Sequence, residues 1–562
     1  MLSAEVILAW TTERLAKGAD SEALAALAEA VARFPADSGI AVRHADALHL
    51  AGQLAPAAAA YRRALLLDPA AVDGWNGLGC VELARGAFGE TVRCLREALA
   101  LQPGRLDIRF NLGKALFDLG EVDAAVDCYR AVVAAGPSAL AQGARAALAA
   151  IIPGAASADN AAVLRVRRDW ARKEAKALGL AGRFRPAPAA IGGKLRIGYV
   201  SAFFGDRNWM KPVWAAVNHH DRARFEIHFF HDVKPPSTES GYRDHADDVV
   251  HDVRGATNEG LASYVARCGI DILVDLNGYS HPSRLDLFMR RPAPVIVGWF
   301  NMFATTGIDA FDYIIGDDAV IPESEERFYS ERVRRVPGSY LAFNVLYPVP
   351  DVEPPPVLAT GSLTFGCFAS QYKLTEATVA IFAAILQGAP QARLLLKSRP
   401  LADESNRSAV RARFAHHGVA SERVLMEGPD EHFAFLAAYA RVDIALDPFP
   451  YSGGTTTMEA LWQGVPVLTF NGDRWASRTS RSLLLAAGLE EWCLADRDAL
   501  IRRTIALAVS PTTPSALAAL RTSLRDRIAK TAACDGAALC RGLETLYEEI
   551  AIREGRRSGE PL

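Results

Sequence analysis

A turn of small polar residues between two apolar runs is the strongest chemical pattern in this sequence. The runs, Ile444 to Leu446 and Val465 to Phe470, are short and predict buried strands. A helical stretch between them begins at residues that are mostly glycine or carry hydroxyl groups: Ser452, Gly453, Gly454, Thr455, Thr456 and Thr457. A helix that starts there offers unpaired amide groups and the positive end of its dipole to an anion. Taken alone, the turn fits a plain capped helix equally well.

Two charged residues extend this pattern toward a ligand that carries both phosphate and sugar groups. Glu459 stands one turn into the expected helix and has acceptor oxygens for vicinal hydroxyls of a sugar. Lys373 follows the apolar run Leu363 to Phe368, and its ammonium group suits diphosphate oxygens, with Ser370 and Gln371 as neighbouring donors. A lone lysine in such a place is more often a solvated residue. Together these residues predict a diphosphate site at the carboxyl end of a parallel sheet.

The elements that must position these residues form two successive sets of short β-rich runs that alternate with helical segments. The first set spans residues 195–200, 225–230, 270–275, 295–299 and 313–315. The second set spans residues 363–368, 393–397, 424–426, 444–446 and 465–470. A proline-rich joint, Pro348 to Pro356, separates the sets. This order predicts two doubly wound α/β lobes with a ligand-binding cleft between them.

The first quarter of the chain repeats itself every 34 residues. Prolines recur with this step at positions 35, 69, 103 and 137, and glycines at 52, 86 and 120. Leu78-Gly79 recurs as Leu112-Gly113, and Trp75 precedes the first of these pairs. The period and its residues resemble tetratricopeptide repeats, in which stacked helical pairs form a superhelix that binds protein segments. A rigid spacer or a dimerisation arm is the alternative role for the repeats.

Composition excludes several classes of protein. The 562-residue chain is half apolar and carries a formal charge of -3, which argues against nucleic acid or an anionic membrane as the main partner. Its eight cysteines have no CxxC spacing, so we expect neither a disulfide framework nor a metal site. Neither a signal-peptide core nor a run of about 18 uncharged apolar residues is present, which predicts a soluble, cytoplasmic protein.

We therefore expect five parts along the chain. They are a repeat domain (1–150), a helical linker ending in the Pro/Gly cluster Arg185 to Gly193 (151–193), a first α/β lobe (194–346), a second α/β lobe that carries the predicted diphosphate site (357–514), and a helical segment that packs back on the lobes (515–562).

In this order, several motifs resemble the family of protein O-linked N-acetylglucosamine transferases and the related SPINDLY protein O-fucosyltransferases, in its bacterial branch. The motifs are Ile197-Gly-Tyr-Val-Ser201, Asp271-Ile-Leu-Val-Asp-Leu-Asn-Gly-Tyr279, Arg291-Pro-Ala-Pro294, Tyr372-Lys373, Asp447-Pro-Phe-Pro-Tyr-Ser-Gly-Gly-Thr-Thr-Thr457 and Ala476-Ser-Arg478. The resemblance covers the repeats and nearly all of residues 194 to 510.

The resemblance implies a GT-B fold of two Rossmann-like lobes and an inverting, metal-independent glycosyltransferase. No cofactor is expected beyond the nucleotide-sugar co-substrate, with UDP-GlcNAc as the first guess, and the sugar is transferred to Ser or Thr hydroxyls of a protein that the repeats recruit. By motif match, Lys373 holds the diphosphate as an electrostatic catalyst, Thr455 and Thr456 bind it, and Glu459 holds the ribose. The other implied donor-binding residues are Ser370, Gln371, Gly453, Gly454 and Thr457.

The segment after the first strand departs from the family pattern. Arg207 stands where the family has a histidine facing the acceptor, and an arginine cannot act as a base at neutral pH. Asp206 is a candidate base by its nearness in sequence, although a turn aspartate is the more common role. Candidates for the acceptor or sugar side are Arg207, Asn208, Lys211 and His281. Gly454 also replaces a histidine of the animal enzyme.

Two alternatives stay open at this point. Arg207 and Lys211 suit an acidic sugar nucleotide, as in flagellin glycosylation, and GDP-fucose is a further donor of the same reaction class. The missing histidine suits a repeat scaffold whose transferase domain is not catalytic. The donor, the acceptor protein, the base and the formation of homo-oligomers are not specified by the sequence.

Overall fold

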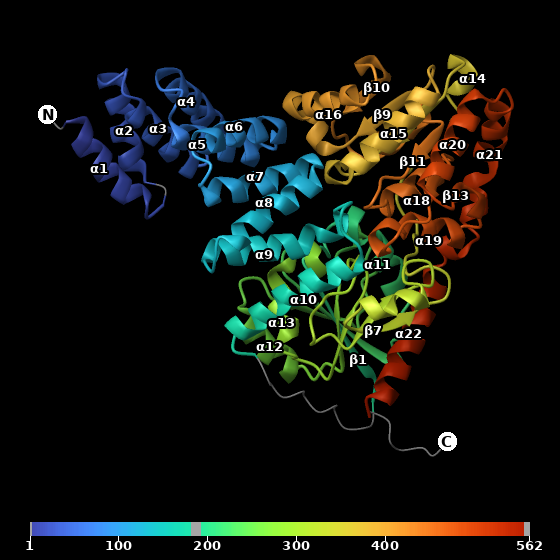
Figure 1. Cartoon of the computed structure of the whole chain (residues 1–562). Coiled ribbons are helices and arrows are strands. Elements are labelled where there is room, and N and C mark those ends of the chain that lie inside the picture. Colours follow the sequence, from blue (N-terminus) through green and yellow to red (C-terminus); the bar gives the residue numbers. More distant parts are fainter. Residues whose placement is uncertain (1–2, 19, 181–192, 556–562) are drawn as a thin grey trace.

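A helical arm and two α/β lobes make up the computed structural model, which describes residues 3–18, 20–180 and 193–555 (Figure 1). Within these residues the arm consists of four antiparallel helix pairs. The helices are α1 (Ala4–Leu15), α2 (Ser21–Arg33), α3 (Ser38–Leu50), α4 (Leu54–Leu67), α5 (Val72–Arg85), α6 (Phe88–Leu101), α7 (Leu106–Leu119) and α8 (Val122–Ala134). The predicted tetratricopeptide-type arm is therefore confirmed.

The periodic residues explain the geometry of the arm. Gly86 and Gly120 end α5 and α7 in the left-handed conformation, with φ of 78° and 94°, which favours glycine. Gly79 and Gly113, which lie one period apart, each allow a close approach within a helix pair. A Cβ atom at Gly79 would lie 2.7 Å from Cδ2 of Leu95, and one at Gly113 would lie 2.9 Å from Cε1 of Tyr129. The sequence period thus reflects repeated helix ends and repeated close contacts between paired helices.

Helices α9 (Ala139–Ile151) and α10 (Asn160–Ala177) connect the arm to the first lobe. Arg167 of α10 is buried and donates to three backbone carbonyls: to Ala149 at 3.0 Å, to Met302 at 3.3 Å and to Thr305 at 2.7 Å. Its guanidinium also lies 3.9 Å from the ring centroid of Tyr279. One arginine therefore joins the helical linker to two loops of the first lobe.

The first lobe contains a seven-stranded parallel sheet in the order β3-β2-β1-β4-β5-β6-β7. Its strands are β1 (Leu195–Ser201), β2 (Phe225–His231), β3 (Val249–Asp252), β4 (Ile272–Asp275), β5 (Val295–Gly298), β6 (Tyr313–Gly316) and β7 (Arg332–Arg335). The sequence missed β3 and β7. Both are edge strands, and their exposed or arginine-rich residues lack the apolar run that marks a central parallel strand.

The second lobe contains a six-stranded parallel sheet in the order β10-β9-β8-β11-β12-β13. Its strands are β8 (Thr364–Cys367), β9 (Arg393–Lys397), β10 (Val424–Glu427), β11 (Ile444–Leu446), β12 (Val467–Phe470) and β13 (Cys493–Leu494). Only the two-residue edge strand β13 was absent from the expectation. Both lobes match the predicted doubly wound pattern, so the predicted fold class is confirmed.

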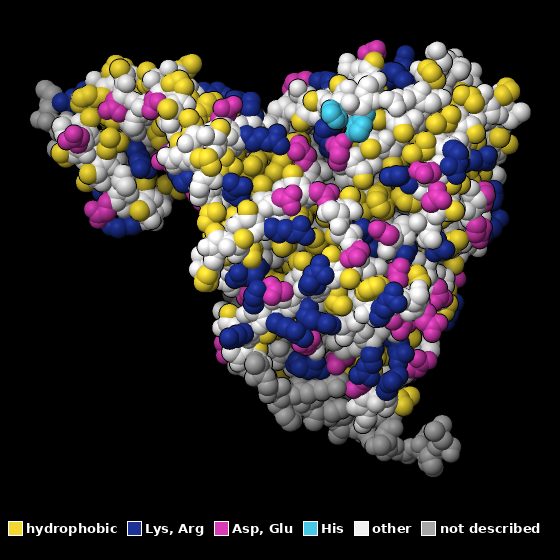
Figure 2. All heavy atoms as spheres, in the orientation of Figure 1, with side chains coloured by type: hydrophobic (Ala, Val, Ile, Leu, Met, Phe, Trp, Pro, Cys, Tyr) yellow, Lys and Arg dark blue, Asp and Glu magenta, His cyan; other side chains and the backbone are white. Residues whose placement is uncertain are grey.

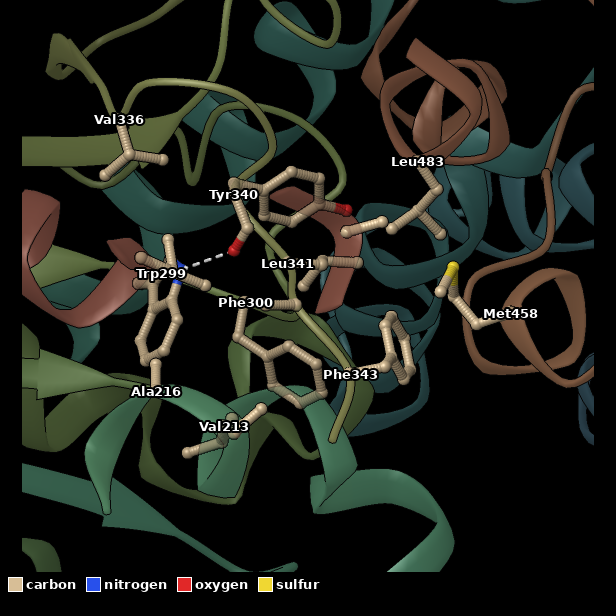
Figure 3. Close-up of a cluster of buried hydrophobic side chains, with 14 of the residues drawn as sticks. Val213, Ala216, Trp299, Phe300, Val336, Tyr340, Leu341, Phe343, Met458 and Leu483 are labelled. Carbon is tan, nitrogen blue, oxygen red and sulfur yellow. Dashed lines mark hydrogen bonds between the residues drawn. The ribbon is translucent and has the colours of Figure 1, made fainter. Parts of the chain in front are cut away.

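A shared apolar core joins the two lobes (Figure 3). Val213 of α11 (Arg207–Val217) and Trp299 beyond β5 come from the first lobe, while Met458 of α18 (Thr455–Trp462) and Leu483 of α19 (Thr479–Ala486) come from the second. The indole of Trp299 donates to the carbonyl of Tyr340 at 3.2 Å. This core fixes the two walls of the cleft relative to each other.

The C-terminal helices also span both lobes. Helix α20 (Arg497–Val509) packs on α15 (Glu376–Gly388), α21 (Thr513–Ile528) packs on α18, and α22 (Gly536–Arg553) returns to α11 of the first lobe. Part of the expected boundary at Arg185 to Gly193 and the last residues of the expected 515–562 segment lie outside the described residues. Among the helices that the structure describes, none combines the length and apolarity that a membrane crossing requires.

The arm docks on the second lobe beside the segment that carries Lys373. Helix α6 packs on α16 (Glu404–His416), and α7 packs on the short helix η6 (Gln371–Lys373). The ring of Phe117 stacks on Tyr372 with centroids 5.2 Å apart. In Figure 2 a notch separates the outer arm from the second lobe, and on this face positive and negative side chains are interspersed.

Candidate functional site

A cavity of about 550 Å³ opens between the two lobes and brings together most of the residues that the sequence selected. Residues of both lobes line it. From the first lobe these are Asp206, Asn208, Trp209, Pro212, Phe300, Asn301, Phe303, Tyr340 and Leu341. From the second lobe they are Ala369, Ser370, Tyr372, Lys373, Asp430, Glu431, His432, Phe435, Ser452, Gly453, Gly454, Thr455, Thr456, Glu459 and Thr479.

The second-lobe wall is the polar turn and the helix that follows it. Helix α18 begins at Thr455, and its N-cap residue, Gly454, offers no side-chain cap. The first hydrogen bond that closes the helix runs from the amide of Met458 to the carbonyl of Gly454 at 3.1 Å. Among the described residues, none accepts from the amides of Thr455 and Thr456. These donors therefore face the cavity at the positive end of the helix.

Asp447 stabilises this turn through three hydrogen bonds. Its carboxylate accepts the amide of Gly453, the hydroxyl of Ser480 and the hydroxyl of Thr469, each at 2.7 Å. Burial raises the pKa of Asp447 to about 6. Thr457 bonds Ser480 at 2.8 Å and lies outside the lining, so its hydroxyl supports the turn. The amide of Gly453 is likewise taken by Asp447 and is not free for a ligand.

Lys373 reaches the same turn from η6. Its Nζ donates to the carbonyl of Ser452 at 2.8 Å and lies 5.0 Å from the ring centroid of Tyr451. Burial lowers the pKa of Lys373 to about 8. Ser370 lines the cavity, whereas Gln371 is buried outside the lining, and its side-chain amide has no hydrogen-bond partner among the described residues. The cation and the free helix amides thus converge on one side of the cleft.

The first-lobe wall is the start of α11. Asp206 caps this helix and accepts the amides of Asn208 at 3.1 Å and of Trp209 at 3.2 Å. Asn208 approaches the opposite wall, where the hydroxyl of Thr455 lies 3.5 Å from its carbonyl oxygen. Arg207 is exposed and donates to the carbonyl of Glu239 at 3.0 Å, outside the cavity lining. Asp206 therefore combines a cap role with a place in the cavity.

Lys211 and Glu459 form a buried ion pair across the cleft. Nζ of Lys211 lies 2.6 Å from Oε1 of Glu459, and the two side chains are 4% and 7% exposed. The sequence analysis gave these residues separate roles, with Lys211 on the acceptor or sugar side and Glu459 at the ribose. The structure joins them directly, because α11 and α18 meet at this point.

Three histidines, His220, His281 and His432, lie in different surroundings. His281 bonds the hydroxyl of Ser283 at 2.8 Å and lies outside the cavity lining. His220 is buried between the hydroxyl of Tyr199 at 2.8 Å and the carboxylate of Glu544 at 3.0 Å, where it joins α22 to the first lobe. His432, at the start of α17 (His432–Ala437), lines the cavity, and burial lowers its pKa to about 4.

Sequence reasoning did not select several first-lobe residues that line the cavity. Trp209 lies in the first turn of α11, and its indole nitrogen has no hydrogen-bond partner among the described residues. Asn301 and Phe303 follow β5, and Tyr340 belongs to the chain that leads toward the joint. The position directly after the predicted strand 295–299 was the available signal for Asn301 and Phe303, whereas Trp209 and Tyr340 lie well beyond the predicted strands that precede them.

The fold and the site together define a class of protein. Two Rossmann-like lobes, each built on a parallel sheet, with a cavity between them are the arrangement of GT-B glycosyltransferases. Residues 181–345 and 357–540 match glycosyl transferase family 41, and residues 82–148 match the tetratricopeptide repeat. The chain belongs to glycosyl transferase family 41.

Relatives of this chain are known from plants and bacteria. It is 32% identical over 364 residues to the probable UDP-N-acetylglucosamine–peptide N-acetylglucosaminyltransferases SPINDLY of Solanum lycopersicum and Arabidopsis thaliana, an alignment that covers 63% of this chain. The same alignments cover 38% and 39% of those relatives. A mutant of the O-GlcNAc transferase of Thermobaculum terrenum has a similar structure, with a TM-score of 0.78, 30% identity, and coverage of 93% of this chain and 98% of that one.

Proposed function

We propose that this protein is a protein O-glycosyltransferase that moves a sugar from a nucleotide donor to Ser or Thr hydroxyls of a protein. The observation that carries the proposal is the convergence of Lys373 and the free amides of α18 on one wall of the cleft. An ammonium group and a helix N-terminus at the same point suit a diphosphate. The names of the SPINDLY and O-GlcNAc transferase relatives support the reaction class.

The chemistry of the leaving group supports the same assignment. Negative charge grows on the diphosphate as the glycosidic bond breaks, so donors fixed around it stabilise the transition state more than the ground state. Lys373 and the amides of Thr455 and Thr456 are held by the surrounding packing and need little reorganisation. We propose that they make the transfer independent of a metal ion, and that the acceptor attacks directly with inversion.

Asp206 is the proposed general base. Its Oδ1 accepts two amides of α11, while its side chain also lines the cavity. A base must lie within hydrogen-bond reach of the attacking hydroxyl, and Asp206 is the carboxylate that the first lobe contributes to the lining. Asp430, by contrast, belongs to the second lobe and is paired with Lys397 at 2.6 Å.

N-acetylglucosamine from UDP-GlcNAc is the first candidate for the donor, and GDP-fucose is the second. The ion pairing in the cleft weakens the argument for an acidic sugar. Lys211 is neutralised by Glu459, and Arg207 points to the carbonyl of Glu239 outside the cavity. The hypothesis of a repeat scaffold without catalytic activity is weakened as well, because Lys373 and the N-terminus of α18, which has no side-chain cap, both line the cavity.

The acceptor is proposed to enter along the arm. A groove of about 590 Å³ runs over the first helices of successive pairs and is lined mainly by residues of α1, α3 and α5. Its charged members are Arg43, Asp68, Asp73 and Arg105. Mixed charges and apolar contacts suit an extended polypeptide segment. The arm contacts the second lobe through α6 and α7, so a bound segment is held on the same body as the donor site.

A donor screen tests the proposal. Thermal unfolding of the intact chain is measured with UDP-, GDP- and CMP-sugars, and a donor present at 100 times its Kd stabilises the fold by about 2.7 kcal/mol. We expect one donor class to raise the Tm of the wild type and not that of the matched Lys373→Met variant. Mass spectrometry of a host lysate treated with that donor then identifies modified Ser or Thr residues. Stabilisation by no sugar nucleotide, even at millimolar concentration, refutes the proposal.

A further inference from the structure

Four side chains from three parts of the chain meet at the Glu459 end of the cavity. Lys211 comes from the first lobe, Tyr347 from the position just before the proline-rich joint, and His432 and Glu459 from the second lobe. Nζ of Lys211 lies 2.6 Å from Oε1 of Glu459, 3.2 Å from Nε2 of His432, and 4.4 Å from the ring centroid of Tyr347. The ammonium group is therefore the centre of the cluster.

The charges of this cluster depend on one another. Burial lowers the pKa of Lys211 and raises that of Glu459, while the attraction between the two opposes both shifts. His432 is neutral at pH 7, since burial and the nearby cations lower its pKa to about 4. Nε2 of a neutral imidazole can accept from the ammonium group, which places the ring proton on Nδ1. Without Lys211, the carboxylate of Glu459 would be a buried charge with no cation beside it.

The second oxygen of Glu459 is available to a ligand. Oε1 accepts from Lys211, whereas Oε2 takes no hydrogen bond from any described residue. Glu459 and His432 both line the cavity, and Lys211 itself stays outside the lining. Lys211 thus acts on a ligand in the cavity through the residues that it holds.

We propose that Lys211 is a positioning residue for the nucleoside half of the donor: it keeps the carboxylate of Glu459 oriented so that Oε2 accepts a ribose hydroxyl. This inference rests on the proposed function. Because Lys211 belongs to the first lobe and Glu459 to the second, nucleoside recognition is completed by both lobes together. The diphosphate half is recognised independently, by Lys373 and α18 of the second lobe alone.

A role in stability alone would not explain this arrangement. Replacing a buried ion pair by apolar groups is often neutral for stability, so the pair is weak evidence for a purely structural function. The pair also sits beside the cavity, with one acceptor atom left over. A stabilising ion pair has no need for either property.

The test separates the two halves of the ligand. Kd values for UDP, GDP and inorganic pyrophosphate are measured by calorimetry on the intact chain, for the wild type, Lys211→Met and Lys211→Arg. We expect Lys211→Met to raise the Kd of the preferred nucleoside diphosphate at least tenfold and to leave pyrophosphate binding within twofold. Lys211→Arg should recover part of the loss, because the guanidinium keeps the charge. Lys176→Met, which removes an exposed lysine of α10, serves as the control for a change in surface charge.

A double variant distinguishes positioning from a direct contact. If Lys211 acts through Glu459, adding Lys211→Met to Glu459→Gln causes no further loss of nucleoside diphosphate affinity, and the pair of neutral side chains also avoids a buried unpaired charge. Equal losses for pyrophosphate and nucleoside diphosphate, an unchanged Kd in Lys211→Met, or a further loss in the double variant each overturn the inference. Wild-type protein that binds neither nucleoside diphosphate would instead refute the proposed function.

Discussion

We predict that Lys373 makes the affinity of the protein for a nucleoside diphosphate dependent on pH in the alkaline range. Burial lowers the pKa of this lysine from 10.5 to about 8, so the free protein loses the ammonium group above pH 8. Protonation falls from about nine-tenths at pH 7 to about one-tenth at pH 9, and the Kd should rise about tenfold across this interval. The neighbouring Asp447, with a pKa of about 6, stays ionised throughout and contributes no change above pH 7.5.

The assay is calorimetry of the preferred nucleoside diphosphate at half-unit steps from pH 7.5 to 9.5, a range in which its phosphates are already ionised. Lys373→Met should bind the nucleoside diphosphate weakly and with little dependence on pH. Lys373→Arg should keep its affinity as the pH rises, since arginine remains charged. Any loss of affinity with rising pH that Lys373→Met shares with the wild type has its cause in the nucleotide and not in Lys373. A wild-type decline no steeper than that of Lys373→Met would refute the reasoning.

Three further predictions concern residues that hold the site in place. Asp447→Asn should lower the free energy of unfolding by about 1–3 kcal/mol and weaken diphosphate binding, because three donors lose a charged acceptor; unchanged chemical denaturation would contradict this. Arg167→Met should lower the free energy of unfolding by about 3 kcal/mol or more, because three buried carbonyl groups lose their donor. The control is Arg172→Met, which changes an exposed residue of the same helix and should leave the free energy of unfolding unchanged. Phe117→Ala should remove a ring stack on Tyr372 worth about 0.5–1.5 kcal/mol, and it should raise the Kd for pyrophosphate because Tyr372 precedes Lys373. Phe117→Leu should have a Kd between those of the wild type and Phe117→Ala. Equal Kd values in all three proteins would refute a link between the arm and the donor site.

Local patterns were sufficient to predict much of the fold. The 34-residue period specified the helix pairs, because each period contains a helix end and a helix contact that recur in space. Central parallel strands such as β5 and β11 were readable because they are buried on both faces and therefore consist of apolar residues and glycine. The edge strands β3, β7 and β13 were not readable, since partial exposure removes that pattern.

The sequence by itself determined which residues form the second-lobe wall of the cavity, where we propose that an anion binds. The turn before α18 is local, and Lys373 follows a strand that ends at the same edge of the sheet, so short-range rules place both near one another. The tertiary structure decided what the charged residues across the cleft do. Lys211 and Glu459 are 248 residues apart and pair only because α11 and α18 meet between the lobes, and Arg207, four residues earlier on the same helix, faces solvent. Sequence spacing gives side-chain type and local direction, whereas burial and partnership depend on which distant element packs opposite.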